Sequence, residues 1–384
     1  MNNHSNLIYL DNNASTMVAP EVLSTMIPYY NKKYGNVSNT LNIRGFQLQK
    51  DLFQAADSIS SFFNAYSGED FLFTSGATES NNIVLRSIAE NCNVTIPHII
   101  TTNIEHASIL ETCHRLQRKG TEVTYIHSSQ NGIIDPDDLK KSIRKNTVLI
   151  SVMGANNEIG TIQPISEIAK IAHEHNIPFH SDVSQLISSK KIDLKNVPID
   201  FLTFSGHKIH APIGVGCLYI NRECRSLIKP MITGGNQQNG LRSGTINLPG
   251  IIALSCAVEL LNKNFENYNS YILYLRNKLF QSLSQKCNIK LNGSLDYRIS
   301  NNLSIIFSGV SSLAMANKLP DVLFSNSSAC STASQTTSHV LKAIGLNEDD
   351  IRCTIRLGLS RYNTESEIDV VSDKLAYTYL SLKK

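Results

Sequence analysis

The sequence predicts an α/β fold in which a large domain, built on a mainly parallel seven-stranded sheet, is joined to a smaller α+β domain. Short apolar runs rich in β-branched and aromatic residues alternate with helical patterns from about residue 70 to residue 220. Strands that alternate with helices predict a parallel sheet covered on both faces. This alternation stops after about residue 255, and a chain of 384 residues, 41% of them apolar, is long enough to form a second core.

The seven runs that predict the sheet each have the length of a strand. Between two of them, residues 165–175 predict a helix, because Ile165, Ile168 and Ala172 fall on one helical face. Open parallel sheets bind ligands at the carboxyl ends of their strands, so the polar residues that follow the runs are candidates for a site. The runs lie at residues 70–74, 97–102, 122–126, 147–153, 177–183, 200–205 and 215–220.

The smaller domain is predicted from mixed helical and strand patterns in the C-terminal third. Tyr271, Leu275 and Leu279 recur at helical spacing, whereas residues 301–307 and 353–359 are apolar runs typical of strands. These patterns predict helices packed against a second sheet.

A closing helix begins at Thr364, which forms a capping-box signature with Glu367. We expect the large domain to span residues 17–255. The small domain is expected to combine residues 1–16 with residues 256–384.

Charge and cysteine content exclude several classes of protein. The 35 basic residues nearly balance the 32 acidic ones and form no basic run, which argues against nucleic acid or an anionic membrane as a partner. The first residues lack the basic and apolar regions of a secretory signal, and no stretch approaches ~20 consecutive apolar residues. The eight cysteines are scattered without a C-x-x-C pair, which disfavours disulfides and structural zinc. We expect a cytoplasmic protein.

The first candidate site lies in FLFTSGATESNNIVL, a strand followed by a tight turn and the start of a helix. Gly76 permits the turn, and the amides of Ala77 and Thr78 would point from the helix N-terminus toward a bound phosphate. The alternative is an ordinary helix N-terminus without a ligand.

Two further candidates follow later strands. Asp182 ends an apolar strand, where its carboxylate needs a partner such as a protonated ring nitrogen, or else caps a helix. Lys208 follows another strand, and poor hydration there favours a neutral amine that can attack an aldehyde. Ser205 and His207 flank this lysine as candidate phosphate donors. The alternative for Lys208 is a surface lysine that extends its amine to solvent.

A phosphate cradle, an acid for a pyridinium nitrogen and a lysine for an aldehyde are the three groups that pyridoxal 5′-phosphate (PLP) requires. His106 adds a flat ring suited to stacking on the pyridine. Asn157 is placed to form a hydrogen bond with the hydroxyl side of the pyridine ring or with the substrate. Taken alone, each residue would more often be an ordinary loop residue whose hydrogen bonds are made within the protein. Together these residues predict a PLP enzyme.

The sequence resembles the cysteine desulfurases of the NifS/IscS group, which are class V PLP-dependent enzymes. The resemblance extends nearly from end to end, and it implies the PLP-dependent transferase fold of fold type I. The matching motifs are YLDNNAST (9–16), FTSGATESNN (73–82), EHASIL (105–110), NGIIDPDDL (131–139), NNEIGTIQPI (156–165), HSDVSQ (180–185), SGHKIHAPIGVG (205–216), GLRSGTIN (240–247), SSACSTAS (327–334) and IRLGLSRYNTESEID (355–369).

The resemblance implies how the cofactor is bound. Lys208 would join the PLP aldehyde covalently, Asp182 would pair with the pyridine nitrogen, and Gln185 would bond the ring oxygen. His106 would stack on the ring and relay protons. Thr245 would reach the cofactor phosphate of a second subunit, which implies a homodimer. The residues expected to bind PLP are Ala77, Thr78, His106, Asn157, Asp182, Gln185, Ser205, His207, Lys208 and Thr245.

The resemblance also implies the reaction. Read alone, SNSSACSTASQ (325–335) is a surface loop with an incidental thiol, but Cys330 matches the family's persulfide-forming nucleophile. Arg356 and Asn157 would bind the substrate carboxylate, which suits the planar fork of an arginine. Lys208 would be the base at the substrate α-carbon. No resident metal is implied, although Cys330 could transiently ligate an iron–sulfur cluster.

The chain departs from the family's usual motifs at a few positions. Asn42 stands where a histidine is common, and Ala211 and Ile213 stand where glycine and lysine are usual. Gln238 and Asn239 replace a common Glu and Arg. We expect the last four positions to lie near the rim of the active site and the contact between subunits.

The predicted function is a cysteine desulfurase that converts L-cysteine to L-alanine and passes sulfur to an acceptor protein. That sulfur would serve iron–sulfur cluster assembly or the thiolation of tRNA, DNA or a cofactor. A selenocysteine lyase or a related class V aminotransferase would use the same PLP residues, although an aminotransferase needs no mobile cysteine. A degenerate sulfur-transfer scaffold would not need Lys208, Asp182 and Cys330 together.

Overall fold

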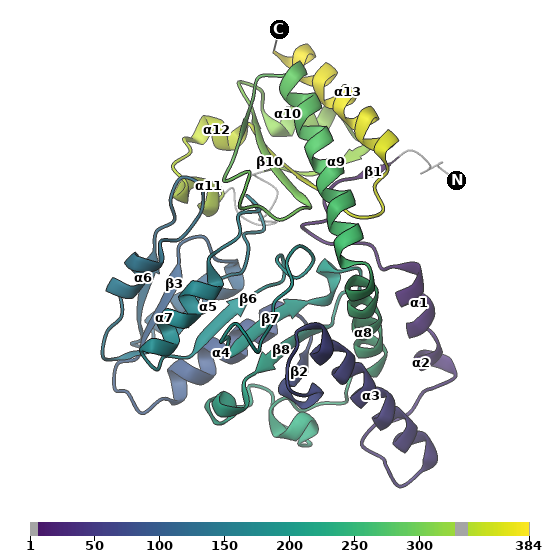
Figure 1. Cartoon of the computed structure of the whole chain (residues 1–384), viewed down its shortest axis with the longest axis vertical. Coiled ribbons are helices and arrows are strands. Elements are labelled where there is room, and N and C mark those ends of the chain that lie inside the picture. The colour runs from purple at the N-terminus through teal and green to yellow at the C-terminus, as the bar shows by residue number, and fades with distance from the viewer. Residues whose placement is uncertain (1–6, 327–336, 384) are drawn as a thin grey trace.

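The computed structural model describes residues 7–326 and 337–383. They form a seven-stranded and a four-stranded sheet, each covered by helices, and a short two-stranded pair (Figure 1). The larger sheet has the strand order β2-β8-β7-β6-β5-β3-β4, and within it β8 runs antiparallel to both neighbours while the other pairs are parallel. Every predicted run forms one of its strands, so the predicted α/β fold is confirmed. The strands are β2 (Phe71–Thr74), β3 (His98–Thr102), β4 (Glu122–Ile126), β5 (Thr147–Ser151), β6 (Phe179–Asp182), β7 (Phe201–Ser205) and β8 (Gly216–Ile220).

Helices cover both faces of the larger sheet, because alternate side chains of each strand enter two separate cores. Leu72 packs on one face, whereas Phe71 and Phe73 pack on the other. The predicted helix over residues 165–175 is present as α7 (Ile165–Glu174). The first face carries α4 (Ala77–Asn91) and α5 (Ala107–Gln117), and the second carries α3 (Ile43–Phe62), α7 and α8 (Leu248–Lys263).

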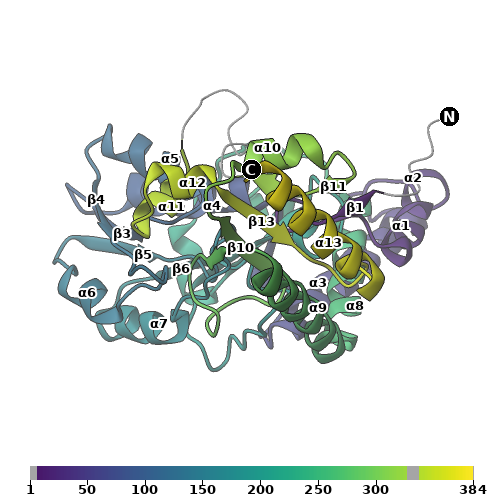
Figure 2. The ribbon, with the colours of Figure 1, turned by 90° about the horizontal axis from the view of Figure 1, so that it is seen from above.

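The smaller sheet is antiparallel, with the order β12-β13-β10-β9. Its helices α9 (Phe265–Lys286) and α13 (Glu365–Leu382) lie side by side over β10 and β13 (Figure 2). The capping box predicted at the start of α13 is confirmed, since the Thr364 side chain and the Glu367 side chain each accept the other's backbone N–H. The strands are β9 (Ile289–Leu291), β10 (Asn302–Phe307), β12 (Ser325–Asn326) and β13 (Thr354–Gly358).

The N-terminal segment packs with the C-terminal third of the chain. Strand β1 (Ile8–Tyr9) pairs in parallel with β11 (Val322–Leu323), and Leu10 belongs to the same core as α9 and α13. The segment after β1 therefore passes between the two sheets, where it meets the carboxyl ends of β6 and β7 through contacts described below.

Short helices complete the fold, and no helix in residues 7–326 and 337–383 is both long and apolar enough to cross a membrane. The short α-helices are α1 (Pro20–Met26), α2 (Pro28–Asn31), α6 (Pro136–Lys141), α10 (Ser312–Lys318), α11 (His339–Ala343) and α12 (Glu348–Arg352). The 3₁₀ turns are η1 (Gly68–Asp70), η2 (Gly206–Lys208), η3 (Arg222–Leu227) and η4 (Gln237–Gly240).

Candidate active site

A cavity of about 450 Å³ lies at the carboxyl ends of β2, β3, β5, β6 and β7, with Arg356 of β13 on its opposite wall. We call it the site cavity. The predicted site residues that line it are Ala77, Thr78, His106, Asn157, Asp182, Gln185, Ser205, His207, Lys208 and Arg356.

Two predicted residues are not among the residues that line this cavity. Thr245 is exposed and lies outside it. Cys330 lies outside the described residues, in the segment 327–336.

One wall of the site cavity is the turn from β2 into α4. Within the described residues no side chain caps α4, whose N-cap residue is Gly76, so the first N–H groups of the helix, at Ala77 and Thr78, remain available to an anion. The turn lies directly against β8: a Cβ on Gly216 would sit 2.5 Å from the Cα of Gly76. Only a glycine at position 216 permits this approach, and the turn is thereby held beside Ser205.

Asp182 ends β6 with its carboxylate turned into the site cavity. The residue is 8% exposed. One oxygen accepts a hydrogen bond from the Asn81 amide at 2.8 Å, and the other accepts one from the Ser184 N–H at 3.0 Å. These two donors fix the orientation of the carboxylate, as a carboxylate that faces a protonated ring nitrogen requires.

Lys208 lies in η2, directly after β7. Its Nζ donates to the carbonyl oxygens of Asn13 at 2.8 Å and Ala14 at 2.7 Å. The Asn13 side chain in turn donates to Gln185 at 3.1 Å and accepts from Asn302 at 3.1 Å. The N-terminal segment therefore holds the lysine amine and ties it to both sheets.

Two histidines in the site cavity are neutral at ordinary pH. Burial, aided by the charge of Lys208, lowers the pKa of His207 to about 4. Burial also lowers the pKa of His106, against the opposing charge of Asp182. Because Nδ1 of His106 accepts the Ser108 N–H at 3.1 Å, its proton lies on Nε2.

Arg356 projects from β13, directly across from Ser325 of β12. Its Nη1 donates to the Asn157 carbonyl at 3.0 Å, and its Nη2 donates to Asp11 at 2.9 Å and to Ser325 at 2.6 Å. The Nε–H is buried and has no hydrogen-bond partner in the described part of the chain. A substrate carboxylate in the cavity would satisfy that donor.

A second cavity of about 570 Å³ adjoins the first, and His106, Asn157 and Arg356 line both. Asn326 and Thr337, the residues that precede and follow the segment 327–336, also line this second cavity. The chain on either side of Cys330 is thus anchored beside the site cavity.

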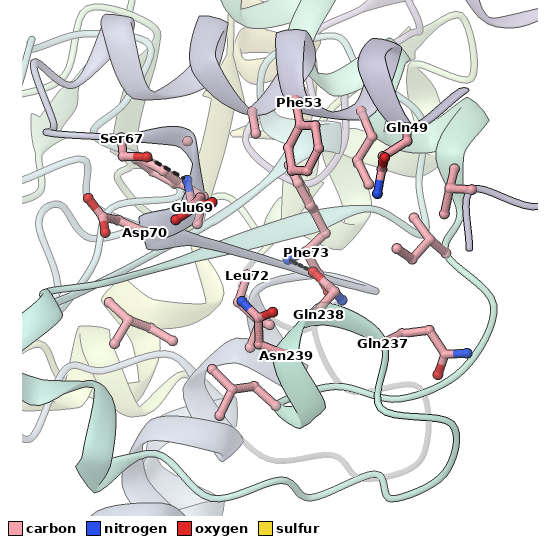
Figure 3. Close-up of a pocket in the computed structure, with 18 of the residues that line it drawn as sticks. Gln49, Phe53, Ser67, Glu69, Asp70, Leu72, Phe73, Gln237, Gln238 and Asn239 are labelled. Carbon is pink, nitrogen blue, oxygen red and sulfur yellow. Dashed lines mark hydrogen bonds between the residues drawn. The ribbon is translucent and has the colours of Figure 1, made fainter. Parts of the chain in front are cut away.

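A third cavity, of about 630 Å³, lies between α3, β2 and the segment 236–246 (Figure 3). None of the described site residues lines it. Gln238 points at the edge strand β2, where its amide accepts from the Phe73 N–H at 2.7 Å and donates to the Phe73 carbonyl at 2.9 Å. Ile246, the neighbour of Thr245, also contributes to its wall.

The other sequence departures fall in separate places. Ile213 lines the site cavity and is 79% exposed, at the rim where we expected it. Ala211 is buried under η2. Asn42 caps α3 by accepting the Gly45 N–H at 2.8 Å.

Asn13, Asn81 and Asp11 contact predicted site residues, although sequence reasoning did not select them. Asn81 carried a weak signal, because an amide on the buried face of a predicted helix needs a polar partner. Asn13 and Asp11 lie inside the YLDNNAST motif, but nothing local in that motif shows what its side chains contact.

Comparisons with known proteins show what the chain as a whole is similar to. A family model described as aminotransferase class-V matches residues 8–371. Cysteine desulfurase IscS of Rickettsia prowazekii (strain Madrid E) is 39% identical over 363 residues, covering 94% of this chain and 88% of that protein. The structure of a NifS-like protein has a TM-score of 0.91 at 33% identity and covers 98% of this chain and 100% of its own. The structure described as SspA in complex with cysteine has a TM-score of 0.83 at 34% identity, with coverages of 93% and 100%.

Proposed function

The chain belongs to the aminotransferase class-V family, and from that premise we propose that it is a PLP-dependent cysteine desulfurase whose nucleophile is Cys330. The reaction converts L-cysteine to L-alanine and leaves the sulfur on an enzyme thiol. The observation that carries the proposal is the site cavity, which unites Lys208, Asp182 and the N-terminus of α4.

The residues of the site cavity fit PLP. The uncapped first turn of α4, with Ser205 and His207, offers donors for a phosphate, and neutral His207 can donate without adding charge. Asp182 would face the pyridine nitrogen, and Lys208 would bond the aldehyde carbon. When bound, PLP supplies an aldehyde that holds the substrate amine and a ring that accepts electron density from the substrate α-carbon.

Lys208 is proposed as the base at the substrate α-carbon. The carbonyls of Asn13 and Ala14 hold its amine in the cavity, so the group does not need to be ordered during the reaction. Because the proton of neutral His106 lies on Nε2, this residue is proposed to stack on the ring and to donate from that nitrogen. Gln185 is proposed to bond the ring oxygen.

Arg356 and Asn157 are proposed to bind the substrate carboxylate. The buried Nε–H of Arg356 supports this role, because a buried donor without a partner is costly until a ligand accepts from it. Both residues line the site cavity together with Lys208.

Cys330 is proposed to attack the substrate sulfur. A new S–S bond forms as the C–S bond of the substrate breaks, and a proton replaces sulfur on the substrate carbon to give L-alanine. The product on the enzyme is a Cys330 persulfide, whose outer sulfur then passes to an acceptor protein. Asn326, four positions before Cys330, lines the cavity next to the site cavity, and four extended residues reach ~13 Å, which supports this assignment.

The protein is proposed to work as a homodimer in which Thr245 reaches the cofactor phosphate of a second copy. Thr245 is exposed and lies outside the site cavity of its own chain, and its neighbour Ile246 borders the partly apolar cavity of Figure 3. Both facts support a role in contact with another chain. We place the working enzyme in the cytoplasm, with an acceptor of iron–sulfur assembly or thiolation as its partner.

The test is to add L-cysteine to the PLP-loaded protein and to measure L-alanine and sulfide in the presence of a thiol reductant. We expect equal amounts of both, and no turnover in a Cys330→Ala variant, with Cys224→Ala as the control thiol. Retained turnover in Cys330→Ala would contradict the assignment of the nucleophile. Production of 3-mercaptopyruvate in place of L-alanine, with a 2-oxo acid as the amino-group acceptor, would indicate an aminotransferase.

A further inference from the structure

Arg356 is held by a closed triangle of hydrogen bonds that the proposed reaction does not use. Its Nη2 donates to Asp11 at 2.9 Å and to Ser325 at 2.6 Å, and the Ser325 hydroxyl donates to the same Asp11 oxygen at 2.6 Å. The triangle joins the N-terminal segment, β12 and β13, which are far apart in sequence.

Strand pairing brings the three side chains of the triangle together. Ser325 and Arg356 are direct partners on the antiparallel strands β12 and β13, so their side chains emerge on the same face. Asp11 forms a backbone bridge to Gly358, two residues after Arg356 and therefore on the same face of β13. The three side chains converge because of strand pairing and not through a flexible loop.

The triangle determines which part of the guanidinium can meet a ligand. Both N–H groups of Nη2 are engaged by Asp11 and Ser325, and one of the two N–H groups of Nη1 donates to the Asn157 carbonyl. The Nε–H is the buried donor that lacks a partner in the described chain, and Arg356 as a whole is buried on the wall of the site cavity. A carboxylate is therefore directed to the Nε edge.

The charge of Asp11 has a second consequence. The guanidinium carries one positive charge, and the Asp11 carboxylate at 2.9 Å offsets much of it. The net charge of the Arg356–Asp11 pair is therefore close to zero. A ligand with one carboxylate binds mainly through its hydrogen bond to the Nε–H. A second negative charge on the same ligand would meet the field of Asp11, and Lys208, the other lysine or arginine among the described residues that line the site cavity, would be bonded to the PLP aldehyde.

We propose that Asp11 and Ser325 are positioning residues that turn the Nε edge of Arg356 toward the substrate and restrict the site to ligands with a single carboxylate. This inference rests on the proposed function, since it takes Arg356 as the carboxylate anchor. It adds a basis for selecting L-cysteine over dicarboxylic amino acids. Neither positioning residue needs to touch the reacting atoms.

The test compares a monocarboxylate and a dicarboxylate as competitive inhibitors of the PLP-loaded enzyme. Asp11→Asn keeps the shape and the accepting oxygen but removes the charge. We expect succinate to bind roughly tenfold more tightly to this variant, because each 1.4 kcal/mol is a factor of ten, and propionate to change by less than about threefold. Ser325→Ala is expected to raise the KM for L-cysteine several-fold, since Arg356 loses part of its alignment.

Asp373→Asn is the matched control, because Asp373 pairs with Lys286 on the exposed surface far from the cavity. Thermal unfolding of every variant checks that it is folded. The affinity for succinate is measured by calorimetry in variants that also carry Cys330→Ala, so that no turnover occurs. Equal shifts for both inhibitors, or none, in folded Asp11→Asn would overturn the inference. Failure of the proposed function is distinct, because it would leave the parent enzyme unable to form L-alanine.

Discussion

Glu105 is a fully buried carboxyl group that supports the site without lining the site cavity. Its Oε1 accepts from the Thr102 hydroxyl at 2.9 Å and from the Met153 N–H at 2.8 Å, while Oε2 is buried without a partner in the described residues. Burial raises its pKa to about 8, and the charge of Asp182 adds to the effect while these two hydrogen bonds oppose it. Glu105 thus joins the ends of β3 and β5 as a neutral acid, next to His106.

This raised pKa predicts a pH-dependent stability. The unfolded carboxyl releases its proton near the ordinary value of 4.5, whereas the folded one keeps it up to about 8. Between these values the folded state binds the extra proton, so the contribution of Glu105 to stability falls as pH rises and levels off above the upper value. Relative to the parent protein, Glu105→Gln should gain stability across that window, as measured by urea unfolding.

Glu266→Gln, at an exposed carboxylate, is the control for this experiment. A constant difference between Glu105→Gln and the parent at every pH would show that Glu105 is already ionised in the folded protein.

At the scale of an element, the close approach of β8 to the turn before α4 decides where the proposed phosphate site lies. Gly216→Ala would place a methyl group 2.5 Å from the Cα of Gly76, and the strand and the turn would have to separate. Overpacking of this kind costs about 1–3 kcal/mol. We expect Gly216→Ala to lose this much stability and to bind PLP with a higher Kd, measured by absorbance titration.

Gly120→Ala offers a contrasting variant, because a Cβ there meets nothing within 4 Å, although its φ of +99° also strains an alanine. It should lose stability without losing PLP affinity. Normal PLP binding by folded Gly216→Ala would contradict the importance of this contact.

The larger elements were predictable because their signals are local. Each strand of the seven-stranded sheet is an apolar run bounded by polar residues, and α7 and α13 carry their periodicity or cap within a few residues. Lys208 and Asp182 were found for the same reason, since strand ends can be read from the sequence. The backbone conformation of Gln238, with φ of 51°, could not be predicted from neighbouring residues. Its side-chain amide bonds Phe73 of β2, which lies 165 positions away in the sequence.

At the scale of the whole molecule, the N-terminal segment connects the two sheets through Asn13. The Asn13 amide contacts Gln185 after β6 and Asn302 of β10, and its backbone carbonyl accepts from Lys208, 195 positions later. Sequence reasoning missed Asn13 because these partners are set by the tertiary fold and not by spacing. The division into domains at residue 17 and residue 255 stays a prediction.

The connection predicts that Asn13→Ala weakens the whole structure and not one sheet. The substitution removes the donor to the Gln185 side-chain oxygen and one of the two acceptors of the Asn302 amide, and a buried group left unsatisfied costs about 1–3 kcal/mol. We expect a single calorimetric transition in the parent protein and a lower Tm in Asn13→Ala. Asn91→Ala, at the end of α4, is the control, and an equal loss there would show that the effect is not specific to the connection.

The contact between Asp11 and Arg356 has a consequence for synthesis of the protein on the ribosome. Asp11 is made 345 positions before its partner Arg356. At translation rates of roughly 5–20 residues per second, the first segment waits on the order of tens of seconds for the strands it must join. Lys208 and its carbonyl partners can meet earlier, but the proposed carboxylate anchor is completed only when β13 emerges. A chain made only as far as β12 therefore lacks Arg356 and, with it, the proposed carboxylate anchor.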